Sequence, residues 1–268
     1  MDRLAHVDQR LNQPKVAIIG GGWAGLAAAV ELCAAGVPVA VFEAARQLGG
    51  RARRIEIDGH TLDNGQHILI GAYRETFRLM RRIHAPGTDP EQLFLRLPLT
   101  IRHPASGFHM RLLPSSMPFP AQLRLALGLL GAQACTLPEK ITAARFMRAL
   151  QAKRYQLAPD TTVDTLLDRS GQTGTLRRML WDPLCLAALN TPPERASAQI
   201  FANVLRDSLG GDRRATDLLL PAADLGRVLP DAAAAFIAAR GGSVHLSRRI
   251  ERIAREEQYW RIDGEVYD

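Results

Sequence analysis

The chain has 268 residues and a formal net charge of +7, with 47% hydrophobic and 23% charged residues. This composition is typical of a folded globular protein and excludes a disordered chain, and the length suits one large domain or two small ones. The longest apolar run, residues 16–30, is interrupted by glycines and is shorter than the ~18–20 residues that a membrane span needs. Residues 1–14 lack the apolar core of a secretory signal, so we expect a cytoplasmic protein.

The first structured segments predict a strand, a helix and a second strand. Residues 15–19 (KVAII) form a short apolar run that leads into glycines. Residues 26–35 (LAAAVELCAA) are strong helix formers that end at Gly36, and residues 37–42 (VPVAVF) predict the next strand. This order is a βαβ unit, in which the crossover helix makes the two strands parallel neighbours.

The pattern changes after about Gly71, where prolines separate helical stretches such as residues 121–130 and 139–152. Further on, residues 224–240 predict a helix, and short strands are expected at residues 243–246, 250–255 and 259–262. The sequence therefore predicts an α/β fold, with a Rossmann-type dinucleotide-binding domain and an inserted, mainly helical cap domain. We expect the first part of the cofactor domain in residues 1–75, the cap in residues 76–215 and the return to the cofactor domain in residues 216–268.

The three cysteines, Cys33, Cys135 and Cys185, stand far apart in the sequence. No CxxC pair and no group of histidines at ligand spacing accompanies them, which argues against a disulfide framework and against a zinc site. We therefore expect buried or unreactive thiols and no bound metal.

A glycine-rich turn joins the first strand to the helix and matches the pattern G-x-G-x-x-G at Gly20, Gly22 and Gly25. The glycines would allow a tight turn, a close approach of the backbone to a pyrophosphate, and close packing of helix on strand. The pyrophosphate is expected on free N–H groups at the helix N-terminus, including those of Trp23 and Ala24.

An acidic residue, Glu43, stands at the end of the second strand. Its carboxylate is expected to accept hydrogen bonds from the ribose hydroxyls of the adenosine, which argues against NADP because that cofactor carries a 2′-phosphate. The alternative is a solvated carboxylate at the end of a strand.

The choice between NAD and FAD depends on the segment LGGRA at residues 48–52. The pair Gly49-Gly50 followed by Arg51 resembles the second motif of the flavin amine oxidase and phytoene desaturase superfamily, in which backbone and arginine meet the FAD diphosphate. An ordinary turn is the alternative. The resemblance implies FAD as the cofactor and includes Ile250 among the residues that contact it.

Longer blocks resemble the squalene-associated FAD-dependent desaturases, whose bacterial members act as hydroxysqualene dehydroxylases in hopanoid synthesis. The matching blocks are residues 63–73 (DNGQHILIGAY), 181–201 (WDPLCLAALNTPPERASAQIF), 205–211 (LRDSLGG) and 218–231 (LLLPAADLGRVLPD). The resemblance implies reductive removal of the hydroxyl of hydroxysqualene to give squalene, with reduced FAD as hydride donor. A carotenoid-type desaturase or an amine oxidase is the alternative enzyme, because one fold serves both directions of chemistry. The alternative that is not an enzyme is a non-catalytic chain or an assembly subunit.

Departure of the hydroxyl calls for a proton, and two residues are candidates for the general acid. His67 follows the turn that contains Gly65, in a segment that the resemblance places close to the flavin. Asp182, in the block that begins at residue 181, is the second candidate. The alternatives are that His67 binds backbone or cofactor and that Asp182 caps the following turn.

The expected partners follow from the substrate class and from the charge distribution. A C30 isoprenoid is almost entirely apolar, so its site should be a long apolar tunnel in the cap. Residues 76–155 hold twelve Lys or Arg against three acids and include the apolar stretch 112–130, so we expect this region to meet anionic lipid at the inner face of a membrane. The basic stretch lacks interleaved aromatic residues, which argues against nucleic acid. Neighbouring enzymes of squalene synthesis are further candidate partners.

In the resembling family a C-terminal portion follows the point that corresponds to residues 267–268 and covers the flavin end of FAD. We therefore expect a cofactor domain that is incomplete at its C-terminus, with the ADP-binding half intact and the isoalloxazine site open to water. The strands of residues 243–262 are expected to lack a successor, which would leave an unpaired sheet edge.

Overall fold

The computed structural model describes residues 15–268, so the interpretation of residues 1–14 as lacking a secretory signal lies outside the described part. The chain forms two compact units. Unit 1 contains the described residues up to His67 together with Arg74–Leu95 and Pro221–Asp268, and unit 2 contains Ile68–Tyr73 and Arg96–Leu220.

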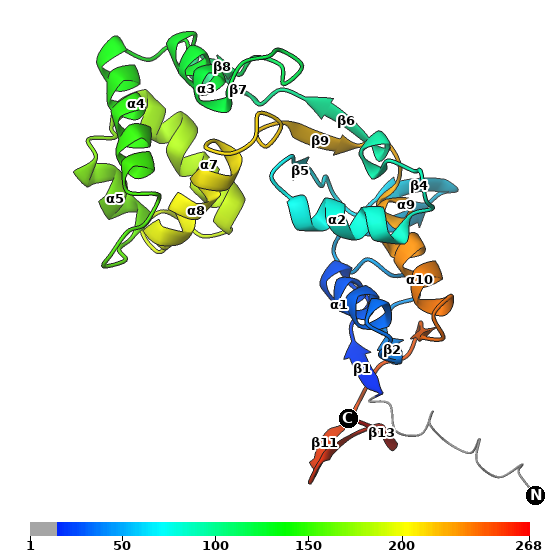
Figure 1. Cartoon of the computed structure of the whole chain (residues 1–268). Coiled ribbons are helices and arrows are strands. Elements are labelled where there is room, and N and C mark those ends of the chain that lie inside the picture. Colours follow the sequence, from blue (N-terminus) through cyan, green and yellow to red (C-terminus); the bar gives the residue numbers. More distant parts are fainter. Residues whose placement is uncertain (1–14) are drawn as a thin grey trace, which may run out of the picture. The chain divides into compact units, whose positions relative to one another are not determined.

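Unit 1 is built on a parallel sheet with the strand order β1-β2-β10. Figure 1 labels its first two strands, β1 and β2, in blue. Strand β1 (Val16–Ile19) lies beside β2 (Val39–Phe42), which in turn pairs with β10 (Ser243–His245). Helix α1 (Trp23–Ala34) connects the first two strands, which confirms the predicted βαβ unit. The helix begins three residues before the predicted position, because the glycine turn is shorter than the sequence pattern indicated.

Two further helices pack against α1 in unit 1. They are α2 (Arg74–Ile83) and α10 (Pro230–Ala238). The single helix predicted over residues 224–240 is wrong, because α9 (Leu225–Val228) ends before α10 begins. The interruption falls at Leu229, whose φ of −142° is not helical and which precedes a proline that has no N–H to donate.

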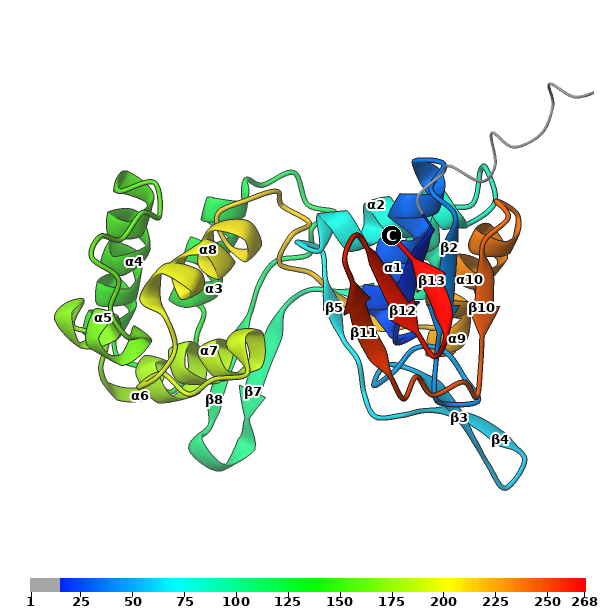
Figure 2. The same ribbon diagram turned by 90° about the horizontal axis from the view of Figure 1, so that it is seen from below.

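Unit 1 also contains a hairpin and a meander. The hairpin pairs β3 (Arg54–Ile57) with β4 (His60–Asp63). The meander consists of β11 (Ile253–Glu256), β12 (Tyr259–Ile262) and β13 (Glu265–Tyr267), as Figure 2 shows. β13 pairs with β12, so the expectation that the strands up to residue 262 lack a successor is wrong. Tyr267 packs edge-to-face on Phe42, with 6.2 Å between the ring centroids, and so joins the meander to the parallel sheet.

Unit 2 is mainly helical, as predicted for the cap. Its hairpin pairs β7 (Thr100–His103) with β8 (Phe108–Arg111), and a π-helical turn covers Arg177–Trp181. Its helices are α3 (Ala121–Leu130), α4 (Leu137–Ala152), α5 (Val163–Arg169), α6 (Gly174–Leu176), α7 (Asp182–Leu189) and α8 (Ala198–Ser208). The core is a single apolar cluster in which Trp181 is fully buried and packs edge-to-face on Phe146 at 5.4 Å.

Short elements complete the chain. They are the strands β5 (Leu69–Ile70), β6 (Phe94–Leu97) and β9 (Leu218–Pro221) and the 3-10 turns Pro90–Leu93 and Pro104–Ser106. β5 pairs antiparallel with β9, with Leu69 opposite Leu219.

The units differ from the predicted domains in three segments. Residues 68–73 and 216–220, predicted as cofactor domain, lie in unit 2, where β5 pairs with β9. Residues 76–95, predicted as cap, lie in unit 1. The reason is the amphipathic helix α2, which buries Phe77, Leu79, Met80 and Ile83. Phe77 also meets Phe94 edge-to-face, with 5.7 Å between the ring centroids. The prolines that follow Gly71 thus mark loops without marking the domain boundary.

Candidate functional site

The turn between β1 and α1 is shaped by glycines. Gly20 has a φ of +108°, a conformation that residues with a side chain rarely adopt. A Cβ built on Gly25 would lie 2.0 Å from the carbonyl oxygen of Gly20. The first turn of α1 therefore packs directly on the end of β1, as the fingerprint predicted.

The N-terminus of α1 is left open for an anion. Gly22 occupies the N-cap position without a side chain to cap the helix, and the first turn contains no acid. The first backbone bond into the helix runs from the Leu26 N–H to the Gly22 carbonyl at 2.9 Å. The N–H groups of Trp23 and Ala24 have no acceptor in the described part of the chain, so they are available to a diphosphate together with the positive end of the helix dipole.

A second glycine turn lies against the first. Gly49 and Gly50 have φ values of +107° and +60°, and the Gly49 N–H donates to the Gly21 carbonyl at 2.8 Å. A Cβ on Gly50 would lie 3.1 Å from the Cα of Gly22, so this close approach favours glycine at position 50. Contact between the two predicted motifs favours a shared ligand over the alternative of an ordinary turn.

Three further side chains surround these turns. The Trp23 indole Nε1–H donates to the Ala52 carbonyl at 3.0 Å, which ties α1 to the second glycine turn. The exposed Arg51 guanidinium has no hydrogen-bond or ion-pair partner among the described residues, so it is free to meet a phosphate. Asn64 Nδ2 donates to the Arg51 carbonyl at 3.3 Å, which brings the segment with Gly65 beside this turn.

Glu43 lies at the end of β2 and accepts two backbone hydrogen bonds. Its Oε2 accepts the Gly21 N–H at 2.7 Å and its Oε1 accepts the Ala45 N–H at 2.8 Å. The side chain is half-buried and fixed against the glycine turn, unlike the solvated carboxylate of the alternative. Each carboxylate oxygen keeps a further lone pair, which is the acceptor that a ribose hydroxyl needs.

Ile250 lies outside the strand in which it was predicted, because β11 begins at residue 253. It packs against the apolar cluster that contains Phe42 and Tyr267. The chain just before it follows the end of β2, since the Arg248 N–H donates to the Glu43 carbonyl at 2.9 Å. Ile250 therefore belongs to the same end of unit 1 as Glu43.

The described residues thus fit the ADP half of a dinucleotide. An open helix N-terminus, two glycine turns in contact, and a fixed carboxylate for ribose lie at the carboxyl end of β1 and β2. Ligands of such sheets bind beyond this edge of the strands.

The two candidate acids belong to different units and have different surroundings. His67, in unit 1, is half-buried, and its Nδ1 lies 3.1 Å from the Gly65 carbonyl. A carbonyl only accepts, so Nδ1 carries the proton and Nε2 donates one only when the ring is doubly protonated. This contact agrees with the alternative that His67 binds backbone. It also leaves Nε2 available to donate a proton.

Asp182, in unit 2, is held by Arg177, whose Nε donates to its Oδ1 at 2.7 Å. Arg177 also pairs with Asp164 and Asp168 and so gathers three carboxylates around one guanidinium. Asp182 is the first residue of α7 and does not cap it. The ion pair with Arg177 occupies Oδ1 of Asp182, so this geometry favours a structural role for Asp182.

The basic region of residues 76–155 is not one charged face. Arg78 and Arg82 pair with Glu31 at 3.0 and 3.1 Å within unit 1. Arg124 is only 1% exposed and pairs with the buried Asp217 in unit 2. The count of basic residues in this region therefore overstates how much positive charge is free at the surface. The sequence-based prediction did not identify Asp217 as a buried partner of Arg124. The sequence feature that could have indicated it is an acidic residue directly before the apolar run 218–220.

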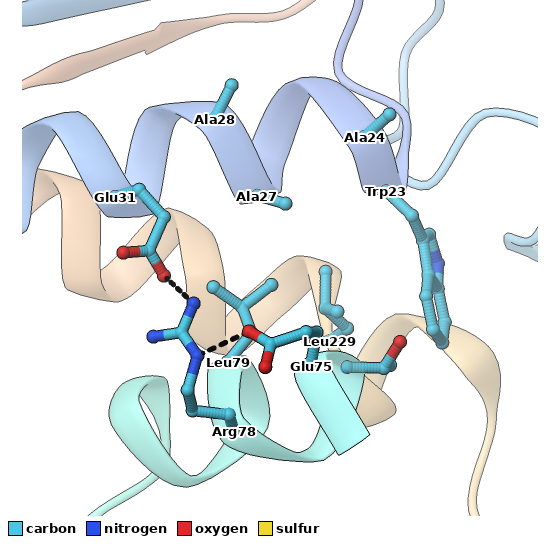
Figure 3. Close-up of a pocket in the computed structure, with 10 residues that line it drawn as sticks. Trp23, Ala24, Ala27, Ala28, Glu31, Glu75, Arg78, Leu79 and Leu229 are labelled. Atoms are coloured by element: carbon cyan, nitrogen blue, oxygen red, sulfur yellow. Dashed lines mark hydrogen bonds and ion pairs between the residues drawn. The ribbon is translucent and has the colours of Figure 1, made fainter. Parts of the chain in front are cut away.

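Figure 3 shows an apolar hollow of about 420 Å³ on the flank of α1. Trp23, Ala27 and Leu79 line it, and Arg78 bridges Glu31 and Glu75 at its edge. The side chains of Trp23 and Ala24 thus border this hollow, and only their backbone groups contribute to the anion site.

This arrangement defines a dinucleotide-binding protein with an inserted helical cap. The family model of flavin containing amine oxidoreductases matches residues 23–267, so the chain belongs to this family and its cofactor is FAD.

Individual relatives support the same assignment. The chain is 30% identical over 255 residues to hydroxysqualene dehydroxylase of Sinorhizobium fredii, covering 91% of this chain and 55% of the relative. It is 28% identical over 270 residues to the probable zeta-carotene desaturase of Synechococcus elongatus, covering 94% and 53%. The fold is similar to that of an oxidoreductase of Methanosarcina mazei, with a TM-score of 0.62 at 18% identity over 95% of this chain and 57% of that one. The chain spans about half the length of the curated relatives it matches.

Within residues 15–268, no helix has both the length and the apolar character that crossing a membrane requires. The same residues include no group of three or more His, Cys, Asp or Glu arranged to hold a metal ion.

Proposed function

We propose that this chain is part of an FAD-dependent oxidoreductase that acts on an isoprenoid and removes the hydroxyl of hydroxysqualene reductively to give squalene. The observation that carries the cofactor role is the contact between the two glycine turns at the open N-terminus of α1. The similarity to a hydroxysqualene dehydroxylase over 91% of this chain supports the substrate.

When bound, reduced FAD would supply the hydride for the new C–H bond and would be left oxidised, while the C–O bond would break and the hydroxyl would leave as water after taking up a proton. The chain's part is to bind and orient the cofactor and to give that proton. His67 is the candidate donor, through Nε2 of its doubly protonated ring, because Gly65 already holds Nδ1. Asp182 is the weaker candidate, because Arg177 holds its carboxylate.

The test is anaerobic incubation of the photoreduced flavoprotein with hydroxysqualene, with the product identified by mass. We expect squalene, and we expect His67→Gln to lower the rate at least tenfold without loss of bound flavin. His60→Gln is the matched control, because His60 is an exposed histidine of unit 1 in β4. Bound flavin without any squalene would overturn the proposed reaction, and absence of bound flavin would favour the non-catalytic alternative.

A carotenoid desaturase is the second candidate, since the chain also resembles a probable zeta-carotene desaturase over 94% of its length. That reaction is an oxidation, so it needs oxidised FAD and gives a more unsaturated product. Incubating the oxidised flavoprotein with zeta-carotene separates the two candidates, because the direction of chemistry differs on one fold.

We also propose that unit 2 meets a lipid surface through the outer face of α3. Leu123, Leu127 and Leu130 recur at helical spacing and are 43%, 40% and 60% exposed. The exposed Arg145 and Arg148 on the neighbouring helix α4 supply positive charge. Three other leucines of the predicted stretch are buried in the core instead: Leu112, Leu125 and Leu129. The set of leucines that can face lipid is therefore smaller than the sequence predicts.

Flotation with anionic and neutral vesicles tests this surface. We expect binding to anionic vesicles that fades with salt, and we expect Leu127→Asp to reduce it. Leu186→Asp is the control, because Leu186 is also an exposed leucine of unit 2 but lies on α7. Equal effects of the two substitutions, or no preference for anionic lipid, would contradict the proposal.

A further inference from the structure

A second cavity, of about 240 Å³, lies wholly within unit 2, between α3, α4 and the chain just after α8. Figure 1 shows α3 and α4 in green and α8 in yellow. Its walls are apolar and come from Leu125 and Leu129 on α3, Met147 on α4, and Leu209. The cofactor residues described above belong to unit 1, whereas all residues that line this cavity belong to unit 2.

One polar group in the cavity wall has no partner. Tyr155 is 8% exposed, and its hydroxyl makes no hydrogen bond to any described residue. A Cβ built on Gly210 would lie 2.5 Å from that hydroxyl, so a glycine is needed here to leave the phenol its space. Burial raises the pKa of Tyr155, although the charge of Arg206 opposes the shift, so the hydroxyl stays protonated and can donate.

The backbone holds Tyr155 in this position against its preference. Arg154 and Tyr155 have φ values of +51° and +57°, in the left-handed region that residues other than glycine rarely adopt. The Tyr155 N–H donates to the Leu150 carbonyl at 2.8 Å, and Gln199 Nε2 donates to the Tyr155 carbonyl at 2.9 Å. Such enforced conformations are concentrated at functional sites.

The charge around the cavity is positive. Arg148 and Gln151 on α4 and Gln122 on α3 complete the lining, and none of the described lining residues is acidic. Arg148 is exposed and forms no ion pair within the described residues. The available groups are therefore a phenol O–H that has no partner among the described residues, a free guanidinium and amides beside apolar walls. These groups match an anionic oxygen head on an apolar tail.

From this combination we propose that the cavity binds the carboxylate end of a single-chain lipid, a long-chain fatty acid. The methylene chain would lie against Leu125, Leu129 and Met147, and the carboxylate would accept from the Tyr155 hydroxyl and the Arg148 guanidinium. Cavities that enclose drug-sized ligands measure roughly 300–1,000 Å³, so this one encloses part of a long chain.

The first experiment blocks the cavity. The protein is titrated with cis-parinaric acid below its micelle concentration, and saturable fluorescence enhancement is expected. Ala144→Trp fills the cavity from α4 and should weaken binding about tenfold or more, since it displaces most of the apolar contact. Ala149→Trp is the matched control, because Ala149 is also exposed on α4 but does not line the cavity, and its affinity should stay within about twofold.

The second experiment tests the head group. Tyr155→Phe and Arg148→Gln should each weaken binding of the acid about threefold to tenfold, with unchanged circular dichroism and melting. Arg169→Gln, at an exposed position of α5 that does not line the cavity, should have no effect. The methyl ester and the corresponding alcohol should bind the wild type more weakly than the acid. The proposal is overturned if the acid shows no saturable binding, if the two tryptophan variants behave alike, or if the ester or an isoprenoid alcohol binds as tightly as the acid.

Discussion

Replacement of the buried Asp217 by alanine is expected to destabilise unit 2 strongly. Its carboxylate accepts hydrogen bonds from Arg124 at 3.3 Å, from Arg96 at 3.2 Å and from the Ser115 hydroxyl. Asp217 and Arg124 are both 1% exposed, so the substitution leaves a buried guanidinium without its counter-charge. Breaking a buried pair in this way costs about 3–5 kcal/mol.

Thermal unfolding followed by circular dichroism measures this loss. At about 2–4 °C per kcal/mol for a domain approaching 150 residues, the melting temperature of unit 2 should fall by roughly 6–20 °C. Asp217→Asn should cost less, because an amide oxygen still accepts. The control is Asp207→Ala, which breaks the ion pair between Asp207 and Arg206. The Asp207 side chain is 57% exposed, so this substitution should lower the free energy of unfolding by no more than about 0.5 kcal/mol. Equal melting temperatures for the two alanine variants would refute the reasoning.

Three further predictions concern unit 1. Glu43→Ala should weaken FAD binding about tenfold to a hundredfold, since hydrogen bonds to a charged acceptor contribute about 1.5–3 kcal/mol, and a flavin titration with unchanged affinity would reject the ribose assignment. Gly25→Ala should abolish measurable FAD binding, because its Cβ would lie 2.0 Å from a carbonyl oxygen, whereas the exposed Ala28→Ser should bind normally in the same titration. Burial and the hydrogen bond to Glu265 raise the pKa of Tyr267 from 10.0 to about 12, so its contribution to stability is complete below pH 10 and is lost as the pH rises through about 12. Urea unfolding across this pH range should show that decline, and Tyr267→Phe should flatten it.

Local patterns were enough to find the cofactor end of the fold. The strand, glycine turn, helix and second strand were predicted because each depends on neighbours in sequence: apolar runs, helix formers and the space that only glycine leaves. The 121–130 helix has the predicted bounds for the same reason. The start of α4 was missed by two residues, because Thr136 and Glu139 form a capping box before the apolar pattern begins.

The sequence by itself determined the family, the βαβ unit and the residue types of the cofactor site, including Glu43 and the two glycine turns. Only the tertiary structure decided that Arg124 is buried against Asp217, that Asp182 is held by Arg177, and that residues 76–95 pack in unit 1. The physical reason is sequence separation. A turn or a helix is specified by residues a few positions apart, whereas the partner of a buried charge or the neighbour of an apolar face is brought in from a distant segment and leaves no periodic mark in the sequence.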